Sequence, residues 1–379
     1  MPASRKTVSA RGTRNRVKEG TVSIINIPPK TPSSFPRIDL PIKPPFPPME
    51  AKSADSIPAK GAYLFEPKWD GFRCLAFRNR DQVLLQSKAG QPLGRYFPEL
   101  VAALGELPAR QFVLDGEIVI FTHGRLSFDD LLQRVHPAAS RIRKLSESTP
   151  ATLMCFDLLV DANGKSLVQL LLAERRKKLE KFLPSKSSSG IIRLSPASLD
   201  PGQAKKWMRE LATMGLDGVI AKKLDEPYRS GERTAMIKVK RIRTADCVVG
   251  GFRYAEKGGG IGSLLLGLHD AEGVIDHVGF TSSFNMNQCE ELKRIVEPLI
   301  GPPGFTGRAP GGPSRWSTRR SSEWHPLKTK LVCEVSYDHF SAGRFRHGTK
   351  FLRWRPEKRP DQCTFEQVEP RQRPHSLAS

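Results

Sequence analysis

The chain has little that would place it in a membrane or carry it across one. No run of about 20 apolar residues occurs, so a membrane-spanning helix is not expected. Residues 1–20 lack the apolar stretch of a secretory signal. We therefore expect a soluble protein of the cytoplasm that has no membrane partner.

Cysteine is also scarce. Six cysteines are scattered over 379 residues without zinc-ligand spacing, and the eight histidines form no metal signature. Several cysteines lie inside apolar runs that are typical of strands. We expect reduced, mostly buried thiols and no structural zinc.

Acidic residues are outnumbered. Lys and Arg together number 61 against 39 Asp and Glu, which gives a formal charge of +22 and an isoelectric point near 10.0. A basic surface favours a polyanionic partner, because binding a phosphate backbone releases counterions. Charge alone does not separate a nucleic-acid enzyme from a passive binder.

The first segment of the chain is rich in proline. Residues 1–49 hold ten prolines and only two acids, Glu19 and Asp39. Such a composition buries too little apolar surface to offset the entropy of ordering, so residues 1–45 are predicted to be a disordered, basic, Pro-rich tail. The tail could track DNA backbone or be a solvated extension.

Two folded regions are predicted after the tail, and together they indicate an α+β protein. Residues 46–243 mix strands with helices, the strands expected at 112–121, 152–160 and 217–223 and the helices at 174–183 and 203–214. Residues 244–370 show short apolar runs between Gly-rich turns, which favour a small β-barrel of the OB type. Its strands are expected at 246–254, 262–270, 274–282 and 331–340, with a helix near 287–299 and a C-terminal tail over 371–379.

The stretch "LFEPKWDGFRC" (64–74) raises the question of a reactive lysine. Attack on phosphorus requires a neutral amine, whereas a lysine of ordinary pKa, about 10.4, is protonated at pH 7. Burial beside Trp69 and Phe72, with Arg73 as a neighbouring cation, would lower the pKa of Lys68 and free its lone pair. Taken alone, the Lys-x-Asp-Gly pattern predicts a turn between strands at least as readily.

The run "LDGEIV" places two carboxylates in an apolar strand. Asp115 and Glu117 are two residues apart, so their side chains share one face. Burying them is costly unless they meet a metal, a sugar hydroxyl or a cation.

Two further patterns combine charged groups with strands. "GLDGVIAKK" offers Asp217 and Lys222, and "MIKVKR" places Lys238 and Lys240 on one strand face, which suits the binding of phosphates. Each pattern alone is explained equally well by a salt bridge or an exposed strand face. Their occurrence together, in this order, calls for a common explanation.

The ordered set resembles the covalent nucleotidyltransferase superfamily and, within it, the ATP-dependent DNA ligases. The motifs are "EPKWDGFR", "QSKAGQPLGRYFPEL", "LDGEIVIF", "CFDLL", "GLDGVIAK" and "MIKVK", and the likeness runs from about Pro48 to Gln367. The chain is most similar to stand-alone bacterial ligases related to the ligase module of the multidomain end-joining ligase. The resemblance implies an adenylation domain over 46–243 and an OB domain over 244–370.

The resemblance also implies a reaction. The enzyme would use ATP with Mg²⁺ or Mn²⁺ to seal nicks in double-stranded DNA through lysyl-AMP and DNA-adenylate intermediates. It would act in DNA repair as a monomer near the bacterial nucleoid, with end-joining or repair proteins as possible partners.

Site residues follow from the same likeness. The catalytic set is Lys68, which would attack the α-phosphate, with Asp70, Lys238 and Lys240. Glu66 would recognise the adenine amine, Arg73 the ribose region and Phe156 the adenine face, while Glu117 would hold ribose or metal and Asp217 the metal. The remaining nucleotide-binding residues are Lys88, Lys222, Arg353, Arg355 and Lys358.

Four positions depart from the usual family pattern. Lys88 and Ala89 stand where an Arg-Asn pair is common, and Lys88 cannot make the bidentate contact of an arginine. Asp217 replaces a glutamate, and Glu357 replaces an aspartate in the last motif, "RFRHGTKFLRWRPEK".

Two other functions stay open at this point. One is a different lysyl-nucleotidyl transferase, an RNA ligase or a capping guanylyltransferase, which labelled ATP against labelled GTP would distinguish. The other is a catalytically silent protein that binds nicks or DNA ends, although such a protein has no need of an intact Lys68.

Overall fold

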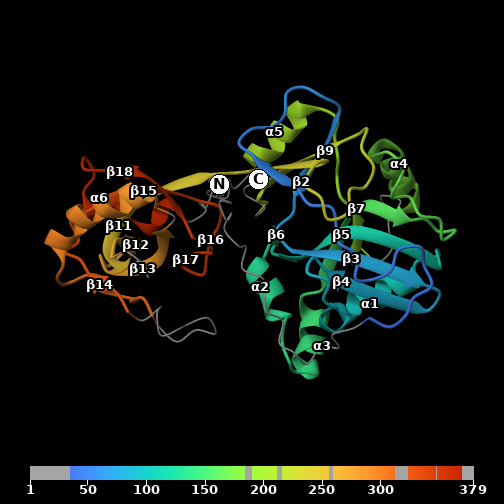
Figure 1. Cartoon of the computed structure of the whole chain (residues 1–379). Helices are drawn as coiled ribbons and strands as arrows, with labels where there is room; N and C mark the ends of the chain where they lie inside the picture. The colour runs from blue at the N-terminus through green and yellow to red at the C-terminus, as the bar shows by residue number, and fades with distance from the viewer. Residues whose placement is uncertain are drawn as a thin grey trace, which may run out of the picture.

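The computed structural model describes residues 35–183, 190–210, 216–255, 259–282, 284–311, 323–346 and 348–368. These residues form two lobes, with the first in blue to yellow and the second in orange to red (Figure 1). The chain passes from one lobe to the other along strand β11 (Arg243–Tyr254). The prediction of an α+β fold is confirmed.

A large sheet forms the body of the first lobe. Its strand order is β4-β3-β5-β7-β8, with β6 beside β5, and only the β7–β8 pairing is parallel. Every residue of β7 is buried, as expected of a central strand that is apolar except for Thr152 and Asp157. The strands are β3 (Phe72–Asn79), β4 (Gln82–Ser87), β5 (Gln111–Thr122), β6 (Arg125–Leu126), β7 (Ala151–Val160) and β8 (Ile192–Leu194).

Helices cover one face of this sheet. Leu100 and Leu104 of α1 and Leu179 of α4 share one apolar core with alternate residues of β3, β5 and β7. The helices are α1 (Pro98–Glu106), α2 (Phe128–Gln133), α3 (Ala139–Ser148) and α4 (Leu172–Phe182), and the short 3-10 turn η1 (Gly94–Tyr96) precedes α1.

A smaller sheet stands beside the other face. Its order is β1-β10-β9-β2, and helix α5 (Pro201–Glu210) packs on it through Ala204. The strands are β1 (Lys52–Ala54), β2 (Tyr63–Lys68), β9 (Gly218–Lys223) and β10 (Met236–Lys240). The helix predicted over 203–214 is therefore present from residue 201 to 210, and residues 211–214 lie outside the described residues.

The Pro-rich lead-in corrects one prediction. The predicted disordered tail includes residues 35–45, yet Ile38, Leu40 and Ile42 are at most 5% exposed and pack on the larger sheet. Alternating apolar residues supply the buried surface, and the neighbouring prolines restrict the unfolded chain, so ordering this segment loses less entropy than its composition suggests. Residues 1–34 and 371–379, also predicted to be tails, lie outside the described residues.

The second lobe is an OB-type sheet. Its order is β13-β12-β11-β15-β18, with β14 beside β11 and a separate hairpin of β16 and β17. Its elements are β12 (Ile261–His269), β13 (Ile275–Ser282), α6 (Met286–Val296), η3 (Glu297–Leu299), β14 (His325–Pro326), β15 (Val332–Tyr337), β16 (Phe340–Ser341), β17 (Arg344–Phe345), β18 (Lys350–Trp354), η4 (Pro360–Gln362) and η5 (Phe365–Gln367).

The edges of this sheet meet without forming a continuous ladder. Across the gap, Thr281 and Thr349 form one parallel bridge, supported by a 3.0 Å hydrogen bond from the Thr281 hydroxyl to the Thr349 carbonyl. The predicted OB fold is confirmed, but the barrel is not closed.

Candidate active site

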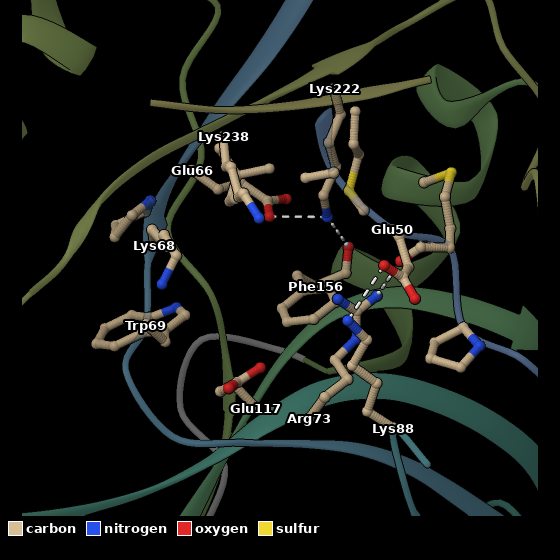
Figure 2. Close-up of a pocket in the computed structure, with 16 residues that line it drawn as sticks. Glu50, Glu66, Lys68, Trp69, Arg73, Lys88, Glu117, Phe156, Lys222 and Lys238 are labelled. Atoms are coloured by element: carbon tan, nitrogen blue, oxygen red, sulfur yellow. Dashed lines mark hydrogen bonds and ion pairs between the residues drawn. The ribbon is translucent and has the colours of Figure 1, made fainter. Parts of the chain in front are cut away.

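A cavity of about 210 Å³ opens between the two sheets of the first lobe. Its walls come from β2, β3, β5, β7, β9 and β10, together with residues 48–51 of the lead-in (Figure 2). Eight of the residues predicted from sequence line it: Glu66, Lys68, Arg73, Lys88, Glu117, Phe156, Lys222 and Lys238.

Lys68 is the last residue of β2 and lies opposite Gly218 of β9. Its Nζ donates a hydrogen bond of 2.6 Å to Asp217 Oδ2, and the two side chains are 19% and 6% exposed. Burial alone would lower the pKa of Lys68, but Asp217 and Asp70 outweigh it and the pKa is raised. The predicted lowering by burial and by Arg73 is therefore wrong, because the nearest charges around this amine are carboxylates.

Asp217 is tightly held in the same pair. Burial would raise its pKa, yet Lys68 and Lys240 lower it to about 2. A carboxylate with so low a proton affinity holds the ammonium of Lys68 and is a poor base for removing its proton.

The Asp70-Gly71 and Asp217-Gly218 pairs each depend on the absence of a side chain at the glycine. A Cβ built at Gly71 would lie 2.1 Å from the carbonyl oxygen of Ile118, and one at Gly218, where φ is +154°, would lie 2.1 Å from that of Val239. Glycine therefore lets the backbone beside each aspartate approach a neighbouring strand.

Asp115 and Glu117 leave β5 on the same side but have different partners. Asp115 is fully buried and receives two hydrogen bonds from Arg73, of 2.6 and 2.7 Å, and one of 2.6 Å from the hydroxyl of Tyr228. Glu117 faces the cavity, and burial raises its pKa to about 7 although Arg73 and Lys68 oppose the change. A metal, a sugar hydroxyl or a cation was expected to meet these carboxylates, and for Asp115 the partner is a cation, Arg73.

Arg73 and Tyr228 also fasten the lead-in to the cavity. Arg73 Nη2 donates to the carbonyl of Met49 at 3.2 Å, and the Met49 amide donates to the Tyr228 hydroxyl at 2.9 Å. Residues 48–51 are thereby held as one wall of the cavity.

The opposite end of the cavity is built around Glu66. This residue is 2% exposed, and its carboxylate pairs with Lys222 at 2.8 Å and with Arg176 at 3.4 Å. Lys222 Nζ lies 4.3 Å from the centre of the Phe156 ring, and the Arg73 guanidinium lies 4.6 Å from it. Arg176 was not among the residues predicted from sequence. The one feature that could have indicated it is its position on the buried side of α4, where an apolar residue is expected.

The two lysines of β10 have different surroundings. Lys238 lines the cavity, and burial, Lys240 and Lys68 lower its pKa. Lys240 forms a 2.8 Å pair with Asp338 of the second lobe and lies 4.0 Å from Asp217.

Lys88 lies at the rim. Its Nζ pairs with Glu50 at 3.1 Å, and Glu50 also pairs with Arg233 at 3.0 Å. Because the Lys88 side chain is 56% exposed, this pair adds little stability and leaves the lysine available to a ligand.

The second lobe reaches this site through Arg346. Its guanidinium donates to both carboxylate oxygens of Asp70, at 2.6 and 2.7 Å, and lies 4.0 Å from the centre of the Phe128 ring. Asp70, which the sequence placed in the catalytic set, thus joins the two lobes.

The basic residues of the last motif are not brought to the cavity. Arg353 pairs with Glu334 at 2.8 Å, and Arg355 and Lys358 each pair with Asp246 at 2.7 Å, all within the second lobe. Their nucleotide-binding role remains a prediction and requires a different arrangement of the lobes.

The carboxylates fit a divalent cation only in part. Among the residues that the structure describes, no three acidic, histidine or cysteine side chains gather as a metal site. Glu117 lines the cavity, whereas Asp217 is paired with Lys68 and is not among the lining residues. Mg²⁺ is commonly bound by one or two carboxylates together with substrate phosphates and water, so a site of this kind needs no larger cluster. When bound, the cation would neutralise charge on the phosphates.

Both lobes match families of known proteins. Residues 48–240 match the family model described as ATP dependent DNA ligase domain, and residues 257–358 match the ATP dependent DNA ligase C terminal region. DNA ligase C1 of Mycolicibacterium smegmatis is 44% identical over 342 residues, covering 88% of this chain and 96% of that protein. The chain belongs to the ATP-dependent DNA ligases.

Two further likenesses extend the comparison. The ligase is 30% identical over 311 residues to the multifunctional non-homologous end joining protein LigD of Mycolicibacterium smegmatis, covering 80% of this chain and 37% of that protein. A solved structure from a study of Lig E DNA ligases shares the fold, with a TM-score of 0.50 and 16% identity over 82% of this chain and 99% of that one. The resemblance inferred from the motifs is confirmed, and the ligase uses ATP, a divalent cation and nicked DNA.

In the described part of the chain, no helix has both the length and the apolar content that crossing a membrane requires.

Proposed function

We propose that the ligase seals nicks in duplex DNA with Lys68 as the residue that carries AMP. The observation that supports this most strongly is the position of the Lys68 amine. It lies in a cavity whose walls also present Glu66, Glu117 and Lys238.

The reaction has three steps. The Lys68 amine attacks the α-phosphorus of ATP, forming a P–N bond as the bond to pyrophosphate breaks. The 5′-phosphate at the nick then attacks the phosphorus of lysyl-AMP, so that a pyrophosphate linkage forms as the P–N bond breaks and AMP becomes a good leaving group on the 5′-phosphate. The 3′-hydroxyl attacks the 5′-phosphorus, the phosphodiester forms as the bond to AMP breaks, and AMP departs.

Lys68 must lose a proton before the first step. Since Asp217 has a pKa of about 2, the proton goes to solvent and Asp217 acts as the counter-ion that holds the amine in place. Lys238 then supplies positive charge to the α-phosphate as charge develops there, and Lys240 does so after leaving Asp338.

The other predicted site residues are proposed to bind the nucleotide and the metal. Glu66 receives the adenine amine, Phe156 stacks on the base, and Glu117 holds ribose or metal. Arg73, Lys88 and Lys222 complete the nucleotide site, Asp217 contributes to the metal site, and Arg353, Arg355 and Lys358 join when the lobes rearrange.

The organisation proposed around this chemistry is an adenylation domain to residue 243, led in by residues 35–45, and an OB domain over 244–370. The ligase works as a monomer in the bacterial cytoplasm, near the nucleoid, and acts in DNA repair. The similarity to a protein named for non-homologous end joining supports this role, and end-joining proteins are the corresponding class of partner.

The test is covalent labelling. Purified ligase is incubated with α-labelled ATP and Mg²⁺ or Mn²⁺, separated by denaturing electrophoresis and then given nicked DNA. We expect label on the wild type and on Lys60→Ala, an exposed lysine of the same lobe, but none on Lys68→Ala, and loss of label as the nick is joined. Absence of label from wild type that has first been stripped of AMP with pyrophosphate would favour a silent nick-binding protein.

The role of the basic segment is tested separately. Removal of residues 1–34, which spares the packed lead-in, should weaken nick binding and flatten its salt dependence if this segment contacts DNA backbone. Unchanged binding across the salt series would show that it makes no such contact.

A further inference from the structure

The carboxylate of Glu66 is held by two cations that approach different oxygens. Lys222 pairs with Oε2 at 2.8 Å and Arg176 with Oε1 at 3.4 Å (Figure 2 shows the first pair). An ionised carboxylate has about four acceptor positions, so Glu66 can still receive a hydrogen bond from a ligand in the cavity.

Arg176 is fixed by three partners. Its Nη1 reaches Glu66, its Nη2 donates to the carbonyl of Ser195 at 2.9 Å and its Nε donates to Glu180 at 2.7 Å. The side chain is 8% exposed and does not line the cavity, so it reaches a nucleotide only through Glu66. Since the guanidinium is planar and its donors form a rigid fork, these bonds determine where the Glu66 carboxylate points.

The Arg176 network also extends toward the nucleophile. The hydroxyl of Ser195 accepts a 2.9 Å hydrogen bond from the indole of Trp69, the residue that follows Lys68. The group proposed to bind the base and the chain beside the reactive amine therefore share one support.

We propose that Arg176 is a positioning residue that makes the ligase select adenine over guanine, by keeping Glu66 ionised and aimed at the base. The proposal rests on the proposed function, in which Glu66 receives the adenine amine. At that position guanine carries a carbonyl oxygen, which an ionised carboxylate repels but a protonated carboxyl group can bind as a donor. Discrimination between the bases therefore depends on the charge of Glu66.

The surroundings of Glu66 make this charge sensitive to Arg176. Burial raises the pKa of Glu66, and Lys222 on β9 and Arg176 on α4 oppose that rise, while Asp157 on β7 adds to it. Asp157 is itself paired with Arg175, at 2.9 and 3.0 Å. Without Arg176, Glu66 would keep one cation and would take up its proton at a higher pH.

The experiment measures kcat/KM for labelling of Lys68 by ATP and by GTP over a range of pH, in the full chain. The ratio of the two values is the readout, because the protonation of Lys68 affects both nucleotides alike and cancels. The variants are Arg176→Gln, Arg176→Lys, and Lys177→Gln as a control that removes a charge from an exposed position of the same helix. Glu66→Gln, which is permanently neutral and can donate, marks the lower limit.

We expect Arg176→Gln to lower the ATP-to-GTP ratio by about tenfold, the effect of roughly one pKa unit, and to lose discrimination at a higher pH than the wild type. Arg176→Lys should recover part of the ratio, and Lys177→Gln should match the wild type. Equal losses with ATP and GTP, or an unchanged ratio, would overturn the proposal and leave Arg176 a purely structural residue.

Two other results would have a different meaning from a change in the ATP-to-GTP ratio. Wild type that takes no label from ATP at Lys68 would overturn the proposed function itself. If Arg176→Gln does not fold, the test rests on Arg176→Lys, which lacks the fork: a ratio equal to that of the wild type at every pH would then overturn the proposal.

Discussion

The pair between Arg346 and Asp70 predicts that one step of the reaction can be slowed without the other. The two hydrogen bonds are short, the side chains are 15% and 9% exposed, and the guanidinium also lies on the ring of Phe128. Replacing Arg346 with glutamine would keep one hydrogen bond to the Asp70 carboxylate and remove the other together with the positive charge. The net loss is about 2 kcal/mol, since one hydrogen bond to a charged group contributes about 1.5–3 kcal/mol.

That loss corresponds to about a thirtyfold shift away from the docked arrangement of the lobes. In the docked arrangement Arg353, Arg355 and Lys358 are paired within the second lobe and do not reach the nucleotide cavity. Because these residues are proposed to act in the attack on ATP, we expect docking to assist sealing and not that attack. We therefore expect Arg346→Gln to slow single-turnover sealing of a nick that already carries AMP by about thirtyfold. Labelling by ATP should stay within about twofold of the wild type.

Arg344, an exposed arginine on the same hairpin, provides the control. Arg344→Gln reports the loss of one surface charge and should change sealing much less than Arg346→Gln. The reasoning would be refuted if Arg346→Gln slowed labelling and sealing equally, if it left sealing intact, or if both variants behaved alike.

Three further predictions concern the first lobe and the last motif. Because the pKa of Lys68 is raised, its amine is still mostly protonated at about pH 9. Above the pKa of Glu117, about 7, the rate of labelling should therefore rise about tenfold per pH unit. A plateau near pH 8 in a stopped-time labelling series would contradict this. Tyr228→Phe removes a hydroxyl that donates to the buried carboxylate of Asp115 and accepts from the Met49 amide of the lead-in. It should lower the free energy of unfolding, measured in urea, by about 1–3 kcal/mol and raise KM for ATP. Unchanged values would show that the lead-in wall does not depend on this bond. Arg355→Ala and Lys358→Ala should each slow labelling by about tenfold or more and spare the sealing of a pre-adenylylated nick, and an effect on sealing alone would exclude a role at the nucleotide.

Local pattern predicted which strand faces carry several of the charged residues, and the other site residues followed from the family resemblance. Period-two alternation predicted that Asp115 and Glu117 share one face of β5, and that Lys238 and Lys240 share one face of β10. These positions depend only on strand geometry, which the sequence carries in full. The large apolar strands were predicted from their continuous apolar runs.

What the sequence could not predict depends on residues far apart in the chain. The raised pKa of Lys68 comes from Asp217, 149 residues away, and no local pattern indicates that β2 and β9 are neighbours. The lead-in was assigned to a tail because an average over composition hides the alternation of Ile38, Leu40 and Ile42 among prolines. Arg346 meets Asp70 only because two lobes dock, which neither lobe's own pattern encodes.

The two glycines that follow Asp70 and Asp217 have a bearing on how such a sequence can diverge. Each lets main chain approach main chain, at Ile118 and at Val239, so the backbone beside each carboxylate near the amine is placed largely by backbone contacts. Core residues can therefore drift in size and type over long lineages while the reacting groups keep their positions. Gly71 and Gly218 cannot drift, since even one methyl group would collide with a carbonyl oxygen.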